Sequence, residues 1–143
     1  MLNSLVDENP TVSNLAMKIL SVLLKLASKK EILDCISQFT CNAKISLDPQ
    51  RKEETLKTKT IGIYSLMCLL LAFPNEIYAW SEDVLDLVLK NKKITKSSQI
   101  KIKEFCSKFW KNRAVYLQLS DIKLSEDMMV TLTEIANPYN YFA

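Results

Sequence analysis

The stretch Ile61-Gly-Ile-Tyr-Ser-Leu-Met-Cys-Leu-Leu-Leu-Ala-Phe-Pro74 is the longest apolar run of the chain. It is shorter than the ~20 apolar residues that a helix needs to cross a bilayer, so we expect a buried core helix and no membrane span. Residues 48–60 just before it are rich in charge, which predicts a helix with an exposed first half. Asp48-Pro49 predicts its start, as a cap followed by a first-turn proline, and Pro74 predicts its end.

Five further helices are predicted on either side of this stretch. Apolar residues recur there at the three- and four-residue spacing of an amphipathic helix. The spacing is clearest for Ile102, Phe105, Cys106 and Phe109, which predicts that this face is buried while the nearby lysines point elsewhere. We expect these five helices to begin near Pro10, Lys30, Ser81, Ser97 or Ser98, and Ser125, and the last to stop at Asn137-Pro138.

The composition favours an all-α protein. Of 143 residues, 48% are hydrophobic and 24% charged, with one Gly and four Pro, whereas an all-β fold needs many turn-forming residues. The length fits one helical domain over residues 1–136, followed by a tail over 137–143. Antiparallel helices on short connectors suit either an irregular bundle or three stacked helix pairs, since HEAT-type pairs run ~40 to 47 residues.

Residues for catalysis or metal binding are scarce. The chain has no His, which removes the usual nucleophile-activating base and the commonest zinc ligand. Phosphate-binding loops need several glycines, and Gly62 stands alone inside an apolar helix. The carboxylate pairs Glu53-Glu54 and Glu82-Asp83 lie near helix starts, where they offset the helix dipole. We therefore predict no enzyme activity, no metal and no organic cofactor.

The four cysteines, Cys35, Cys41, Cys68 and Cys106, have no Cys-x-x-Cys spacing. Each lies beside apolar residues in a predicted helix, so we expect buried free thiols. The N-terminal residues lack the basic, apolar and small-residue order of a secretory signal. These features predict a reducing cytoplasmic or nuclear setting.

A basic segment runs from Lys90 to Arg113 and contains a single acid, Glu104. It could contact the phosphates of nucleic acid or chromatin, with Trp110 and Tyr116 available for stacking. A solvated helix face is the favoured interpretation, because arginine is scarce and the net charge is only +3. An acidic protein surface is a third possible partner. The candidate contacts are Lys92, Lys93, Lys101, Lys103, Lys108 and Lys111.

The final residues, Asn137 to Ala143, form an aromatic tail. Pro138 prevents the preceding helix from continuing, and Tyr139, Tyr141 and Phe142 give the tail more aromatic surface than disordered tails usually carry. The tail could fold back onto the helices as a core plug. It could instead be an exposed peptide whose carboxylate enters a basic pocket on a partner protein.

Residues 57–143 resemble the C-terminal region of the large HEAT-repeat proteasome activators, which are single-chain caps of the proteasome core particle. The resemblance rests on motifs that occur in the family's order. They are Gly62, Leu71-Ala72-Phe73-Pro74, Trp80, Val84-Leu85, Glu104-Phe105, Leu124-Ser125-Glu126-Asp127, Leu132-Thr133-Glu134, Pro138 and Tyr141-Phe142-Ala143. The first 56 residues match only as generic helices.

The resemblance implies helix pairs stacked as HEAT-like repeats at the end of an α-solenoid. It also implies docking on the α subunits of the proteasome core, with Tyr141, Phe142 and Ala143 in an intersubunit pocket and support from Pro138 and Tyr139. The Ala143 carboxylate would pair with a pocket lysine, a charge-assisted contact of roughly 1.5 to 3 kcal/mol.

The chain departs from the family in two ways. Phe142 stands where the family has tyrosine, which removes a hydroxyl whose hydrogen bond is worth about 0.5 to 1.5 kcal/mol and so puts gate opening in doubt more than binding. The family members are also very large, so further chains or an upstream solenoid could complete the cap. Without an upstream solenoid, we expect the first helix to expose an apolar face.

Overall fold

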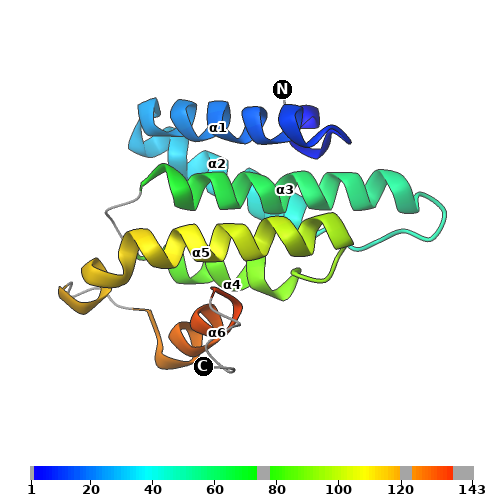
Figure 1. Cartoon of the computed structure of the whole chain (residues 1–143). Helices are drawn as coiled ribbons and strands as arrows, with labels where there is room; N and C mark the ends of the chain where they lie inside the picture. Colours follow the sequence, from blue (N-terminus) through cyan, green and yellow to red (C-terminus); the bar gives the residue numbers. More distant parts are fainter. Residues whose placement is uncertain (1, 74–77, 120–123, 137–143) are drawn as a thin grey trace. The chain divides into compact units, whose positions relative to one another are not determined.

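The computed structural model describes residues 2–73, 78–119 and 124–136. Within these ranges every regular element is a helix, which confirms the predicted all-α class (Figure 1). The chain forms two compact units, Met1–Ala72 and Phe73–Ala143. The predicted boundary between a helical domain and a tail at residue 136 stays a prediction. The elements are η1 (a 3-10 helix, Leu2–Val6), α1 (Pro10–Leu26), α2 (Lys29–Ala43), α3 (Lys52–Ala72), α4 (Ser81–Lys90), α5 (Lys96–Leu119) and α6 (Glu126–Ala136).

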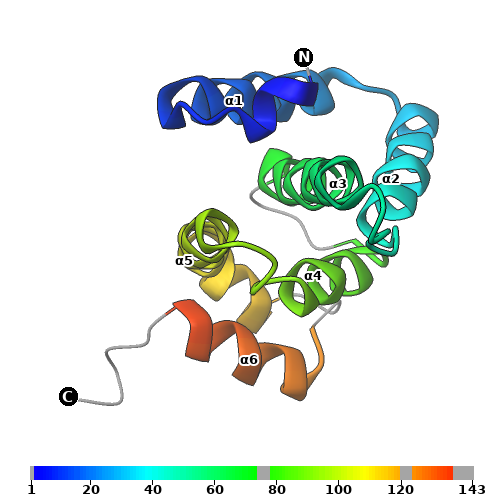
Figure 2. The same cartoon turned by 90° about the vertical axis from the view of Figure 1, so that its right-hand side faces the viewer.

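Helix α3 is the centre of the first unit. Both α1 and α2 pack against it, and Figure 2 shows them on two sides of α3. Residues 62–70 of α3 are all buried, whereas residues 52–54 are exposed, as the charge pattern predicted. The 3-10 helix η1, which the sequence did not predict, also contacts α3 and α1, and its Leu5 is completely buried.

Helices α2 and α3 approach each other closely at Gly62. A Cβ atom built on Gly62 would lie 2.5 Å from the backbone nitrogen of Ala43 and 2.9 Å from the backbone oxygen of Phe39. Only glycine leaves room for this contact between two backbones. One turn earlier in α3, the Lys59 ammonium donates hydrogen bonds to the carbonyls of Ala43, at 2.8 Å, and Ile45, at 3.1 Å. These bonds satisfy carbonyl groups at the end of α2.

The predicted start of α3 was wrong. Asp48 and Pro49 form a turn, in which the Asp48 side chain accepts a hydrogen bond from the Gln50 amide and the Asp48 carbonyl accepts one from the Arg51 amide. The helix begins at Lys52. An Asp side chain can bond the amide two residues later in a turn as well as at a helix cap, and here the turn forms.

The second unit contains α4, α5 and α6. The predicted core face of α5, Ile102, Phe105, Cys106 and Phe109, is buried as expected. The Phe105 and Phe109 rings pack with centroids 5.7 Å apart. The predicted cap of α5 was wrong, because the helix begins at Lys96 and the Thr95 hydroxyl accepts the hydrogen bond from the Ser98 amide. Ser98 is instead a buried residue of the first turn.

Helix α3 is also long and apolar enough, by length and composition alone, to cross a membrane, and no other helix of the described part is. Its most apolar stretch is 67% buried within the protein. Core helices of soluble proteins share this composition, so the feature is explained by the packing of α1 and α2 on it.

Candidate functional site

The predicted docking residues Pro138, Tyr139, Tyr141, Phe142 and Ala143 lie outside the described residues. Helix α6, which ends at Ala136, is the element that leads into them. The part of the candidate site that the structure describes is therefore the support of α6.

The first turn of α6 is fixed from two directions. Within the helix, the Ser125 hydroxyl accepts a hydrogen bond from the Met128 amide at 3.3 Å, as the predicted cap requires. From α4, the Glu82 carboxylate accepts a hydrogen bond from the Ser125 amide. The two residues are 43 positions apart in sequence, so the local pattern gave no signal for this bond. It ties the start of α6 to the start of α4.

The apolar face of α6 holds the rest of the helix in place. Leu132 is fully buried and Met128 nearly so, and Leu124, two residues before the helix, is also buried. The helix packs on α5, whose buried face is the one described above. Each buried aliphatic side chain of this size stabilises by about 1.5 to 3 kcal/mol, so α6 is attached by packing and not only by its cap.

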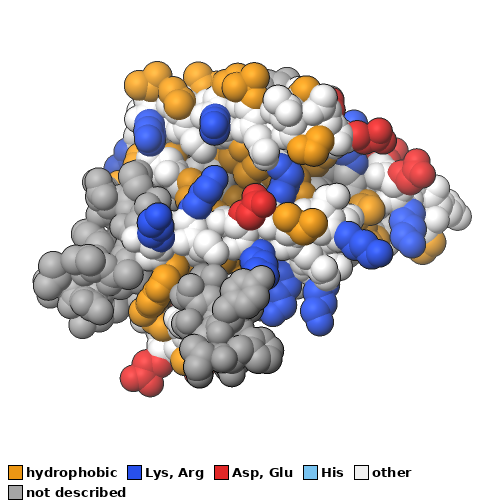
Figure 3. Space-filling view, in the orientation of Figure 1, with side chains coloured by type: hydrophobic (Ala, Val, Ile, Leu, Met, Phe, Trp, Pro, Cys, Tyr) orange, Lys and Arg blue, Asp and Glu red, His pale blue; other side chains and the backbone are white. Residues whose placement is uncertain are grey.

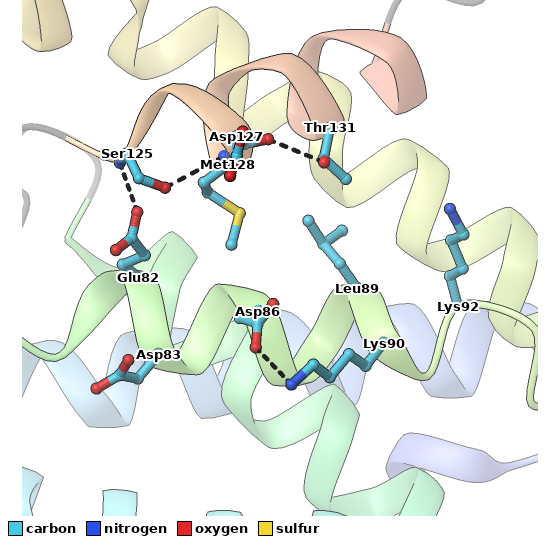
Figure 4. A pocket seen from close by; sticks show the side chains of 10 residues that line it. All are labelled: Glu82, Asp83, Asp86, Leu89, Lys90, Lys92, Ser125, Asp127, Met128 and Thr131. Atoms are coloured by element: carbon cyan, nitrogen blue, oxygen red, sulfur yellow. Dashed lines mark hydrogen bonds and ion pairs between the residues drawn. The ribbon is translucent and has the colours of Figure 1, made fainter.

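A pocket of about 530 Å³ lies between α4 and α6 (Figure 4). Four of its lining residues are acidic, but Glu82 is bonded to the Ser125 amide and Asp86 forms an ion pair with Lys90 at 2.9 Å. Glu82 therefore links two helices, whereas the sequence indicated only an effect on its own helix dipole, and Asp86 pairs within α4. The other lining residues are Asp83, Leu89, Lys92, Asp127, Met128 and Thr131.

The candidate lysines of the basic segment are largely solvent-facing. Lys93, Lys103, Lys108 and Lys111 are exposed, while Lys92 and Lys101 are half-buried. Lys92 also has a local role, because its charge acts on the Cys106 thiol. The six lysines therefore share one segment but differ in exposure. The structure does not describe the side chain of Tyr116, one of the proposed stacking residues.

The four cysteines are free, as predicted, but not all are buried. Cys68 and Cys106 are buried, Cys35 is half-buried and Cys41 is exposed, so the prediction was wrong for Cys41. Burial raises the pKa of the Cys106 thiol to about 12, and Lys92 opposes this shift. Burial, Asp34 and Glu31 raise the pKa of Cys35. Both groups are thiols at neutral pH, so neither is an activated nucleophile.

The rings of Phe73, Tyr78 and Trp80 form an aromatic cluster. The Phe73 and Tyr78 rings meet edge to face with centroids 5.6 Å apart, and Tyr78 stacks on Trp80 at 5.2 Å. Such pairs add about 0.5 to 1.5 kcal/mol beyond the area they bury. Phe73 and Trp80 are among the residues that carried the family resemblance, and the structure gives them a role in packing.

Among the described residues, no group of three or more His, Cys, Asp or Glu side chains could hold a metal ion. The described residues include three candidate binding surfaces. They are helix α6, the basic segment and the apolar face of α1. The protein is all-helical in its described residues, and its helices are compatible with a solenoid.

A family model described as "Proteasome activator complex subunit 4-like, C-terminal" matches residues 56–143. The match covers more than half of the chain, so the chain belongs to this family of proteasome activator proteins. The matched range agrees with the predicted resemblance over residues 57–143. The searches of curated proteins and of solved structures found no match.

Proposed function

We propose that the chain is a non-enzymatic regulator that binds the α ring of the proteasome core particle and anchors there through Tyr141, Phe142 and Ala143. The membership of residues 56–143 in the proteasome activator family carries this proposal, because it makes the proteasome the expected partner. The Ala143 carboxylate pairs with a lysine of an intersubunit pocket, and the aromatic side chains provide area and specificity. Pro138 and Tyr139 support the tail.

The support of α6 is consistent with this role. A docking tail binds more tightly when the helix before it is firmly packed. A loosely packed helix would have to be ordered on binding, which costs entropy. Glu82, Leu124 and Leu132 hold α6 in place. Four free cysteines fit the cytoplasm and nucleus, where we place the protein.

The first experiment on this proposal compares the intact chain with Tyr141→Ala in binding to purified core particles. Tyr141→Ala removes the largest aromatic contact of the terminal three residues, so we expect affinity to fall by about tenfold or more. Tyr78→Ala, in the aromatic cluster of the second unit, is the matched control for loss of an aromatic ring. Equal loss of binding in both variants would argue against tail docking.

Gate opening is a separate part of the proposal and depends on Phe142. Restoring the family's hydroxyl with Phe142→Tyr should leave binding within a few-fold of wild type, since one neutral hydrogen bond is worth about 0.5 to 1.5 kcal/mol. Hydrolysis of a fluorogenic peptide by saturated core particles should rise. Unchanged hydrolysis at saturation would show that this hydroxyl does not limit the gate.

The exposed part of the basic segment favours a second candidate, an adaptor that binds nucleic acid or chromatin. Four of the six candidate lysines face solvent. Binding to phosphates would fall steeply with added salt, with a slope set by the number of phosphates contacted. A flat salt response, or no binding at low salt, would eliminate this candidate.

A further inference from the structure

Large hydrophobic side chains that face solvent are concentrated on α1. Six of the ten in the described part of the chain belong to this helix, and Leu26 is 79% exposed. They recur along α1, and hydrophobic side chains gather along the top of Figure 3, where this helix lies (Figure 1). Isolated exposed hydrophobic residues are normal, but a contiguous band along one helix marks an interaction surface.

The spacing of these residues fits a second helix. Val12, Leu15, Ile19, Val22 and Leu26 are separated by three, four, three and four residues, which is the alternation of positions a and d in a heptad. We call these five residues the outer seam of α1. The seam is about 21 Å long at 1.5 Å per residue, enough for four turns of a partner helix.

The opposite side of α1 is committed to its own unit. Ala16, Leu20 and Leu24 are buried in the core. The Ser13 hydroxyl donates a hydrogen bond to the Leu5 carbonyl at 2.6 Å, and Ser21 donates one to the Cys68 carbonyl at 3.3 Å. Rotating α1 to hide the outer seam would break these contacts, so the seam stays on the outside of the unit.

Charge along the seam selects the partner. Lys18 and Lys25 are exposed, lie one heptad apart and flank the seam on the same edge. Helix α1 contains no Asp or Glu. If a second copy of α1 paired with the seam in antiparallel fashion, Lys18 of one copy would face Lys25 of the other, and the two charges would repel. In parallel pairing the lysines would face the apolar Leu23 edge and gain no ion pair. Acidic residues beside the partner's seam would instead pair with both lysines.

We infer that the outer seam of α1 is a docking surface for an amphipathic helix of a different protein chain, with apolar a and d positions and acidic residues on the edge that faces Lys18 and Lys25. The inference does not depend on the proposed docking tail. It assigns a function to a helix outside the residues matched by the family.

The test uses the full chain and two designed three-heptad peptides. Both peptides carry Leu at a and d; one has Glu at its edges and the other has Lys, and like charges oppose self-pairing of each peptide. We expect the Glu-edged peptide to bind about tenfold more tightly at low salt, from two ion pairs gained against two repulsions. The doubly substituted Lys18→Glu, Lys25→Glu chain should prefer the Lys-edged peptide.

Substitutions in the outer seam distinguish a loss of binding from a loss of folding. Ile19→Gln with Val22→Gln should abolish binding of the Glu-edged peptide with little change in melting temperature, because both side chains face solvent. Ile100→Gln, at an exposed site in the other unit, is the control and should bind normally. Equal binding of the two peptides, binding of neither, or a dimer of the intact chain that dissociates when the seam is substituted would overturn the inference.

Discussion

Gly62 is the residue on which the packing of the first unit depends most directly. Replacing Gly by Ala usually stabilises a helix by about 1 kcal/mol. At Gly62 the added methyl would instead meet backbone atoms of Ala43 and Phe39, which cannot move aside as a flexible side chain can. The approach of α2 to α3 therefore requires glycine here.

We predict that Gly62→Ala lowers the free energy of unfolding by roughly 1 to 3 kcal/mol, the usual cost of overpacking. Urea unfolding followed by circular dichroism measures the change. Lys57→Ala, at an exposed position of the same helix, is the control and should have little effect. Gly62→Ala with wild-type or higher stability would contradict the close approach of the two helices.

Cys106 should make the stability of the second unit depend on pH in the alkaline range. The pKa of its thiol rises from 9.0 to about 12 in the folded chain, mainly because the site is buried. A folded pKa above the unfolded one stabilises the fold below pH 9, and this contribution is lost as the pH rises from 9 toward 12.

We therefore expect the stability difference between wild type and Cys106→Ala to become less favourable to wild type above pH 9, by roughly 1 kcal/mol per pH unit. Chemical denaturation of both proteins at several pH values measures the difference. The small cavity left by the alanine adds an offset that does not change with pH. A pH-independent difference would show that the thiol titrates normally.

At the scale of elements, the start of α2 is held by a capping box. The Ser28 hydroxyl accepts from the Glu31 amide at 3.2 Å, and the Glu31 carboxylate accepts from the Ser28 amide at 2.9 Å. These bonds with Ser28 lower the pKa of Glu31, although its side chain is exposed. The contribution of the charged carboxylate is thus present above pH 4.5 and is lost as the pH falls below it.

We predict that Glu31→Gln flattens the acid side of the stability profile, since the amide can accept the same hydrogen bond without titrating. The melting temperatures of wild type and Glu31→Gln, measured at intervals of about one pH unit between pH 3 and pH 7, give the two profiles. Ser28→Ala keeps the backbone amide that donates to the Glu31 carboxylate, so it should lower stability but leave most of the acid-side slope. A wild-type slope in Glu31→Gln would rule out this cap as its source.

The elements show what local sequence can predict. The spacing in α5 predicted its buried face because helical periodicity and burial agree there. The start of α3 was missed because Asp48 makes the same kind of bond in a turn as in a cap. The bond from Ser125 to Glu82 spans two helices, so only the tertiary structure shows it. Likewise, Gly62 was recognised in the family motif, but not as the point of contact with α2.

At the scale of the whole molecule, the sequence predicted that the candidate site is a binding surface. It did not predict how the residues of that surface are arranged. The scarcity of catalytic residues and the aromatic tail indicated a binding protein, and the order of motifs over residues 57–143 indicated the family to which the chain belongs. The outer seam of α1 was expected only as an apolar face. Its heptad spacing was visible in the sequence, but the structure was needed to show which of the two apolar faces of α1 is left exposed.

The central claim is that the chain docks on the proteasome core through its tail. The most direct measurement is the affinity of purified core particles for the intact chain and for a chain that ends at Tyr141. We predict at least a tenfold loss of affinity on truncation, because the charge-assisted contact of the terminal carboxylate contributes roughly 1.5 to 3 kcal/mol. Equal affinity of the two chains would contradict the claim.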